Sequence, residues 1–404
     1  MRMHFARPEL ASELARQLRG DAVVGGLQHG LFLAAPRGTG LSTFLRRDLE
    51  PQLARAGAVV VHVELSADRR RDGGQLIVDA IARALGWQLR ALAGSVSKAR
   101  LAALGRAFWP DAADPQPGTA GGTTLTDAIC ALQDLCARPV ALVIDDAHHA
   151  LDSPPGEAAM ASLKQASGEL NRRGTVRLQL VLAGSHRDKL LRLMDTAGAP
   201  FQGATIHSLP KLGVPYVDHV VGLIEARRPE LRPVNGVLLA EAFRAFRQRP
   251  GCFGAAIAEA LNPLNDAEGR FEHQVRAAAG REQAAETARR RDDYLGLRPL
   301  EQAVLGRLLE EGRRFRPDDA DTQAFCQQRC PGMSVSSLEV IAALERLRDH
   351  APPLVWRSPR GEYAVEDPGL LVWYQECSRS GEWPPIEAQA SCVAALLSES
   401  GAAG

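Results

Sequence analysis

The stretch APRGTGLSTFL, residues 35–45, joins an apolar run at residues 31–36 to a helical pattern at residues 41–54. Gly38 and Gly40 let the backbone turn sharply and point its N–H groups at a bound anion. The first turn of a helix adds free N–H groups and a partial positive charge. The order strand, glycine loop, helix therefore predicts a phosphate-binding loop. A plain glycine-rich turn between a strand and a helix is the alternative.

The loop departs at two positions from the phosphate-binding pattern G-x-x-x-x-G-K-[ST]. Ala35 stands in place of the first glycine, and Leu41 stands in place of the lysine that neutralises the β- and γ-phosphates. Ser42 occupies the position of the Mg²⁺-ligating hydroxyl, and Arg37 could supply the missing positive charge. Leucine has no hydrogen-bond donor, so we expect weaker phosphate binding and impaired hydrolysis. The candidate nucleotide-binding residues are Arg37, Gly38, Thr39, Gly40, Leu41, Ser42 and Thr43.

Two later strand ends carry further candidate residues. The apolar run at residues 140–145 ends in Asp145 and is followed by Asp146, which is the arrangement of a Walker B motif. We expect Asp145 to hold Mg²⁺ through water beside Ser42, and Asp146 to polarise an attacking water. Ser185 follows the next apolar run, where it either senses the γ-phosphate or caps the helix that comes after it. Asp146 and Ser185 are thus candidate catalytic residues.

Apolar runs alternate with helical patterns in the first half of the chain. The runs are mostly continuous, as in parallel strands that are covered on both faces. This alternation predicts a doubly wound α/β domain, interrupted by a mobile loop at residues 113–124. The expected strands are residues 31–36, 58–65, 140–145, 177–183 and 204–207, and the expected helices are residues 41–54, 75–85, 126–136, 157–171 and 187–194.

The strand signal disappears after residue 209, where a small helical bundle and a long charged helix at residues 271–294 are expected. Three short amphipathic helices and two short strands follow, which is the order of a winged helix-turn-helix. The sequence therefore predicts four parts. They are a P-loop NTPase core at residues 1–210 with a mobile loop near 110–124, a helical lid and connecting helix at 211–295, a winged-helix domain at 296–376 and a tail at 377–404.

With this order of elements the chain resembles a P-loop ATPase of the AAA+/STAND group over roughly residues 20–375. The stretch APRGTGLSTFLRRDLEPQL is similar to the opening motif of the archaeal-ATPase-like branch, and GEYAVEDPGLLVW, residues 361–373, to the close of its winged-helix domain. RQRPGCFGAA, residues 247–256, resembles its lid motif. Arg249 there matches an arginine that faces the nucleotide, although an ordinary surface arginine at a helix end is the alternative. The resemblance implies strand order 5-1-4-3-2, binding of ATP or ADP with Mg²⁺, and nucleotide-controlled conformational change or self-assembly.

Three functions stay open from the sequence. The first is a regulatory or scaffold ATPase that works by self-association or beside a partner protein. The second is a DNA-binding AAA+ protein of the initiator or transposition type. Its reading helix at residues 336–347, followed by Arg348, would carry Glu339 and Glu345 against Arg346 and Arg348. This nearly neutral set favours phosphate contact poorly. The third is a nucleotide-free structural pseudo-ATPase, which the missing lysine suggests.

Composition narrows the classes of partner. Lys and Arg number 48 and so do Asp and Glu, so no net positive field attracts nucleic acid or membrane. No apolar run approaches the ~20 residues of a spanning helix, and residues 1–14 lack the apolar segment of a signal peptide. The seven cysteines show no metal-ligand spacing. We therefore expect a cytoplasmic protein without a membrane partner. His148 and His149 are expected on the surface of a helix.

Overall fold

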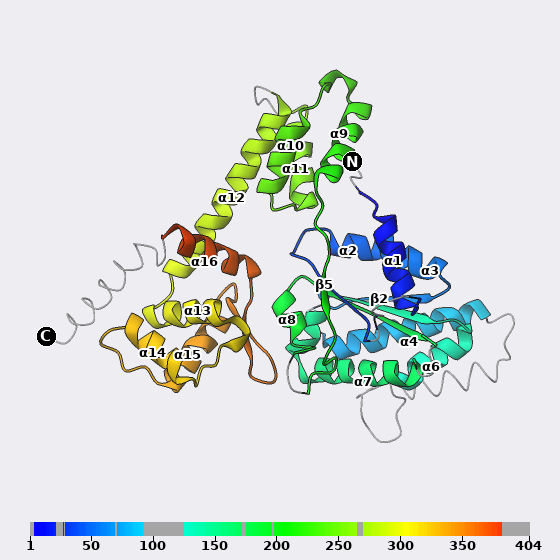
Figure 1. Cartoon of the computed structure of the whole chain (residues 1–404), viewed down its shortest axis with the longest axis horizontal. Coiled ribbons are helices and arrows are strands. Elements are labelled where there is room, and N and C mark those ends of the chain that lie inside the picture. The colour runs from blue at the N-terminus through cyan, green and yellow to red at the C-terminus, as the bar shows by residue number, and fades with distance from the viewer. Residues whose placement is uncertain are drawn as a thin grey trace. The chain divides into compact units, whose positions relative to one another are not determined.

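The computed structural model describes residues 4–21, 27, 29–68, 71–92, 125–171, 175–195, 198–264 and 270–381 (Figure 1). The chain divides into two compact units, Met1–Tyr216 and Val217–Gly404. The mobile loop expected at residues 113–124 and nearly all of the expected tail lie outside the described residues.

A five-stranded parallel sheet forms the centre of the first unit. Its order is β2-β3-β4-β1-β5, which confirms the order that the resemblance implied. All four neighbouring pairs are parallel, so the carboxyl ends of the strands lie at the same edge of the sheet. The strands are β1 (Leu31–Ala34), β2 (Val59–Glu64), β3 (Val140–Asp145), β4 (Leu178–Gly184) and β5 (Ile206–Ser208).

Helices cover both faces of this sheet, which is why its strands are continuous apolar runs. Strands β1, β3 and β4 are buried along their whole length. Helices α1, α2 and α3 share one hydrophobic cluster with these strands, while α4, α6 and α7 pack on one another and lie on the other side of the sheet (Figure 1). The helices are α1 (Pro8–Leu18), α2 (Leu41–Phe44), α3 (Glu50–Arg55), α4 (Gly73–Leu92), α6 (Leu125–Cys136), α7 (Pro154–Leu170) and α8 (Arg187–Leu191).

The helix after the glycine loop is continuous but not uniform. A single helix was expected at residues 41–54, whereas α2 passes through a π-helical turn, η1 (Leu45–Leu49), before α3. Pro51, at the start of α3, has no N–H to donate to the carbonyl of Arg47. The wider turn lies directly before this proline, at the place where a regular helical bond is lost.

The second unit begins with a helical bundle. Helices α10 and α11 both pack against the 25-residue helix α12, and the rings of Phe243 and Phe253 lie 5.0 Å apart between α10 and α11. The expected bundle and long helix are therefore present. The helices are α9 (Val214–Arg227), η4 (Pro229–Leu231), α10 (Gly236–Ala245), α11 (Pro250–Ala260) and α12 (Phe271–Leu295).

Three helices and a hairpin follow α12 at the expected places, around a hydrophobic cluster of their own. Strands β6 and β7 pair antiparallel, and β7 lies against the turn η5. A last helix, α16, begins after the cap Asp367 and was not expected from the sequence. The elements are α13 (Pro299–Glu311), η5 (Gly312–Arg314), α14 (Ala320–Arg329), α15 (Ser337–Arg348), β6 (Val355–Arg357), β7 (Tyr363–Val365) and α16 (Pro368–Ser380).

Candidate functional site

The glycine loop has the backbone geometry of an anion-binding turn. Gly38 and Gly40 have φ angles of +79° and +97°, which only glycine adopts readily. Thr39 closes the turn, because its hydroxyl donates to the carbonyl of Pro36 at 2.6 Å and its N–H donates to the same oxygen at 3.2 Å. No described side chain caps the helix that starts after Gly40. Its first N–H groups therefore point out of the helix end without a side-chain acceptor.

Leu41, at the position of the expected lysine, belongs to the hydrophobic core. Its side chain is 7 % exposed and lies in the cluster that contains Ala11 and Ala15 of α1 and Leu209 after β5. The neighbouring loop residues Arg37, Ser42 and Thr43 are exposed. The lysine position is thus filled by an apolar side chain of the hydrophobic cluster, and Arg37 is the cation that the loop itself presents to solvent.

Asp145 lies at the carboxyl end of β3 and is 1 % exposed. Its Oδ1 accepts the N–H of Asp146 at 3.0 Å, and its Oδ2 is buried without a hydrogen-bond partner among the described residues. Burial raises the pKa of Asp145, although the neighbouring Ser42 hydroxyl acts in the opposite direction. Ser42 after the glycine loop and Asp145 at the end of β3 therefore lie beside one another.

These two side chains suit a magnesium ion. Mg²⁺ prefers oxygen ligands and often takes only one or two from the protein. The buried, unpartnered Oδ2 of Asp145 is a carboxylate oxygen that a cation would satisfy. Asp146 follows with φ +52° and is partly exposed. A left-handed backbone at a residue other than glycine is strained, and such strain is frequent at functional sites.

A second charged group lies near the same edge and was missed in the sequence. Glu64, the last residue of β2, pairs in register with Asp145. Arg46 of η1 forms an ion pair with Glu64 and donates to His62 Nε2 at 3.3 Å, while His62 Nδ1 lies 2.6 Å from Glu50 Oε1. The signal was present in the sequence, since Glu64 ends its strand just as Asp145 does.

Ser185 follows β4 and is partly exposed. It does not cap the next helix: the cap of α8 is His186, whose Nδ1 accepts the N–H of Lys189 at 3.3 Å. The capping interpretation of Ser185 was therefore wrong by one residue. His148 is also not on the surface. It is 4 % exposed, and a Cβ on Gly184 would lie 2.8 Å from its Nδ1.

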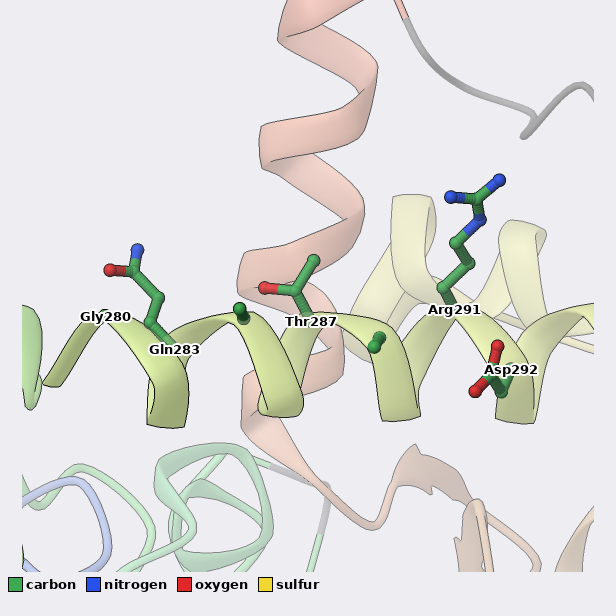
Figure 2. Close-up of a pocket in the computed structure, with 7 residues that line it drawn as sticks. Gly280, Gln283, Thr287, Arg291 and Asp292 are labelled. Carbon is green, nitrogen blue, oxygen red and sulfur yellow. The ribbon is translucent and has the colours of Figure 1, made fainter. Parts of the chain in front are cut away.

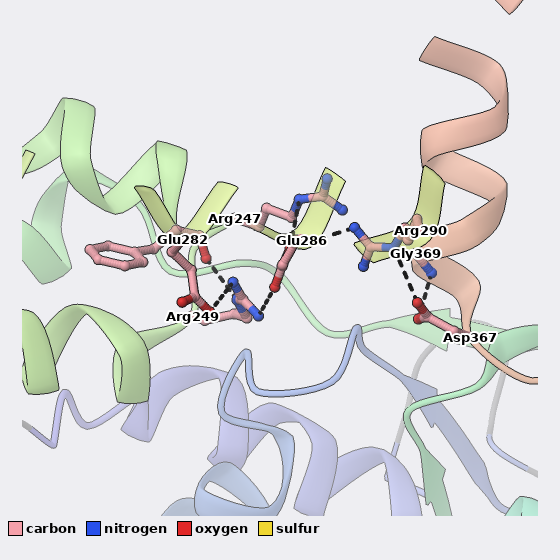
Figure 3. Close-up of polar contacts among 8 residues, drawn as sticks. Arg247, Arg249, Glu282, Glu286, Arg290, Asp367 and Gly369 are labelled. Atoms are coloured by element: carbon pink, nitrogen blue, oxygen red, sulfur yellow. Dashed lines mark hydrogen bonds and ion pairs between the residues drawn. The ribbon is translucent and has the colours of Figure 1, made fainter. Parts of the chain in front are cut away.

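Arg249 belongs to the second unit, where it precedes the first residue of α11. Its Nη1 lies 2.6 Å from Glu286 Oε1 and its Nη2 lies 3.6 Å from Glu282 Oε1, both on α12. Its Nε donates to the carbonyl of Phe246 at 3.0 Å. Figure 3 shows these contacts. Arg249 is thus partly buried in an ion-pair network, unlike an ordinary surface arginine, and the loop residues belong to the first unit.

A hollow runs along α12 in the second unit (Figure 2). Gly280, Gln283, Ala284, Thr287, Ala288, Arg291 and Asp292 line it. All of its lining residues come from this one helix, so the hollow is an open helix face. No candidate site residue lines it.

Within the described ranges there is no group of three or more His, Cys, Asp or Glu side chains placed to hold a metal ion. Among those same residues, no helix combines the length and the apolar character needed to cross a bilayer.

No protein-family model matches the sequence, and no curated protein matches it. Solved structures are similar in fold. The Aeropyrum pernix ORC2 protein, in its ADP form, aligns over 96 % of this chain and 97 % of its own, with TM-score 0.52 and 14 % identity. The Walker-type ATPase paby2304 of Pyrococcus abyssi aligns over 90 % and 95 %, with TM-score 0.43 and 16 % identity. Together with the strand order, the likeness to ORC2 shows that this chain has a P-loop NTPase fold.

Proposed function

We propose that the chain binds ATP or ADP with Mg²⁺ and acts as an AAA+/STAND-like regulatory or scaffold ATPase. Nucleotide would control its conformation, its self-association or its binding to a partner protein. The observation that carries this proposal is that the exposed Ser42, directly after the glycine loop, lies beside Asp145, whose buried Oδ2 has no hydrogen-bond partner among the described residues. The ORC2 structure of the same fold is described as an ADP form, which supports nucleotide as the ligand.

The residues take distinct roles in this proposal. Backbone N–H groups of the loop would bind the phosphates, assisted by the Arg37 side chain. Mg²⁺, when bound, would neutralise phosphate charge. Ser42 and Asp145 would hold it. Asp146 would orient water, and Ser185 and Arg249 would respond to the γ-phosphate. The loop residues assigned to the nucleotide are Arg37, Gly38, Thr39, Gly40, Leu41, Ser42 and Thr43.

Leu41, at the lysine position, lowers the nucleotide affinity and the hydrolysis rate that we expect. When a phosphate loses one charged partner, the binding free energy weakens by on the order of 2–5 kcal/mol, with buried charge pairs as a guide. That corresponds to a factor of about 30 to several thousand in affinity. We therefore expect binding in the micromolar to millimolar range and slow or absent hydrolysis.

Calorimetric titration with ATP and Mg²⁺ tests the proposal, with Leu41→Lys and Arg37→Ala beside the wild type. Micromolar binding by the wild type supports the proposal, and its loss in Arg37→Ala identifies the replacement cation. Absence of binding at millimolar ATP in the wild type, with recovery in Leu41→Lys, makes the chain a nucleotide-free pseudo-ATPase and overturns the ATPase proposal.

DNA binding is the second candidate, favoured by the order α13–α14–α15 followed by the hairpin β6–β7, which is that of a winged helix. The charges on α15 oppose it. Arg346 Nε lies 2.5 Å from Glu301 Oε1, and Arg348 pairs with Glu345. Neither arginine is thus available to a phosphate without breaking an ion pair. Retention on duplex DNA that falls steeply with salt supports this candidate, and indifference to DNA removes it.

A further inference from the structure

A polar network joins the helix after the glycine loop to the end of β2. Arg46, in η1, forms an ion pair with Glu64 through its Nη2, and its Nε donates to His62 Nε2 at 3.3 Å. The Nδ1 of His62 lies 2.6 Å from Oε1 of Glu50, the first residue of α3. One guanidinium thus contacts two residues of the same strand, and both η1 and α3 are tied to β2.

The contacts give each group of this network a single role. Because Arg46 donates to Nε2 of His62, this nitrogen carries no proton, and Nδ1 donates to Glu50. The side chains of His62 and Glu50 are 21 % and 19 % exposed. An isolated ion pair at the surface contributes little to stability. The Arg46–Glu64 pair is not isolated, since the partly buried His62 fixes the same guanidinium.

The network lies next to the contact between Ser42 and Asp145. Ser42 and Arg46 are four residues apart on one helix, which turns from α2 into η1 between them. Glu64 and Asp145 are paired in register at the ends of β2 and β3. Burial raises the pKa of Asp145, and His62 is close enough to act in the opposite direction. The helix is therefore joined to two adjacent strand ends, by Ser42 at one and by Arg46 at the other.

The turn that carries Ser42 needs such a support. No described side chain caps α2, and both Ser42 and Thr43 are exposed. Leu41 and Phe44 pack into the hydrophobic cluster, but apolar packing is non-directional. An ion pair made by the planar fork of an arginine adds a defined geometry to that packing.

We propose that Arg46 and Glu64 are positioning residues. Their ion pair holds the helix so that the Ser42 hydroxyl faces Asp145, and it thereby completes the pair of oxygen atoms that would hold Mg²⁺ with the nucleotide. This inference rests on the proposed function. Neither positioning residue contacts the nucleotide in this role. Loss of either partner releases the same contact, so the two losses have one consequence.

The opposite charges of the two residues separate positioning from a simple electrostatic effect. ATP is an anion, so an electrostatic effect alone would weaken binding without Arg46 and tighten it without Glu64. Positioning instead weakens MgATP binding in both Arg46→Gln and Glu64→Gln, by about fivefold, the upper range for an exposed ion pair. Binding of ATP without Mg²⁺ should stay within about twofold of the wild type at physiological salt, which screens exposed charges.

Three further proteins complete the comparison. Arg46→Gln combined with Glu64→Gln should bind MgATP no more weakly than either single variant, because the contact is lost only once. Arg46→Glu combined with Glu64→Arg restores a pair of opposite charges and should bind MgATP more tightly than either single variant. Arg71→Gln is the matched control, since it breaks the separate Arg71–Asp79 pair of the same unit, whose side chains are about as exposed.

The experiment is calorimetric titration of the full chain and its variants with ATP, once with Mg²⁺ and once with EDTA. Hydrogen exchange of η1 is measured beside it without nucleotide. We expect equal, Mg²⁺-dependent weakening in Arg46→Gln and Glu64→Gln, together with faster exchange in η1, and no change in Arg71→Gln.

Three results overturn this proposal and leave the proposed function standing. They are effects of opposite sign in the two single variants, an unchanged MgATP affinity in both, and an equal loss of affinity with and without Mg²⁺. Absence of MgATP binding in the wild type overturns both. If one single variant does not fold, the charge-exchanged protein decides, because an affinity no better than that of the other single variant overturns the proposal.

Discussion

Replacing Leu41 by lysine tests how much the burial of this side chain contributes to stability. Leu41 is 7 % exposed and packs with α1 and the strands. Full burial of a leucine side chain contributes about 1.5–3 kcal/mol. A lysine stem can keep part of that contact while its ammonium reaches the surface. We therefore expect Leu41→Lys to lower the free energy of unfolding by about 2 kcal/mol in the absence of nucleotide. For a unit of this size that lowers the Tm by roughly 4–8 °C.

Bound nucleotide should offset the lower Tm of Leu41→Lys. The new ammonium would restore a phosphate contact of about 2–5 kcal/mol, so saturating MgATP should raise the Tm of Leu41→Lys far more than that of the wild type. Thermal unfolding with and without MgATP measures both effects, and Leu41→Met is the control because it keeps the apolar volume without charge. A wild-type Tm for nucleotide-free Leu41→Lys would refute the burial argument. An unchanged affinity in a folded variant would refute the placement of phosphate at this loop.

Other substitutions separate stability from binding. Asp145→Asn should raise the free energy of unfolding by about 1 kcal/mol at pH 7, because it removes an unsatisfied buried charge, and should abolish Mg²⁺-dependent binding in calorimetry. Burial raises the pKa of Asp145 above 3.8. Ionisation of Asp145 therefore lowers the free energy of unfolding as pH rises from 3.8 through the folded-state pKa. Below that range the wild-type carboxyl is neutral too, so denaturant titrations should show no difference in the free energy of unfolding between Asp145→Asn and the wild type. Gly40→Ala should lower the free energy of unfolding by about 1–2 kcal/mol because φ is +97°. Gly168→Ala, in open space on α7, should raise the free energy of unfolding by about 1 kcal/mol, and denaturant titration measures both changes.

The sheet could be predicted from the sequence because its signal is local. Parallel strands buried on both faces must be apolar along their length. The run that ends in Asp145 was predicted with the bounds that β3 has in the structure. Ser42 follows β1 and Asp145 ends β3, and these two strands are separated in the sheet by β4 alone, with all three ending at the same edge.

Elements outside this pattern were missed for different reasons. Helix α1 has buried Ala11, Ala15 and Leu18 at helical spacing, but it precedes the first strand and matched no expected motif. Helix α16 lay inside a stretch interpreted as the close of the winged-helix domain. Ser185 and His186 are adjacent, and only the backbone of α8 decides which of them is the cap.

The sequence also could not show where two site residues would lie. It shows that leucine stands at the lysine position 41, but the hydrophobic cluster that this leucine joins includes α1 residues about 30 positions away. It places Arg249 before a proline, but the partner Glu286 lies on a different helix. Contacts between distant segments are not encoded in local periodicity, so the sequence identified these residues without their environment.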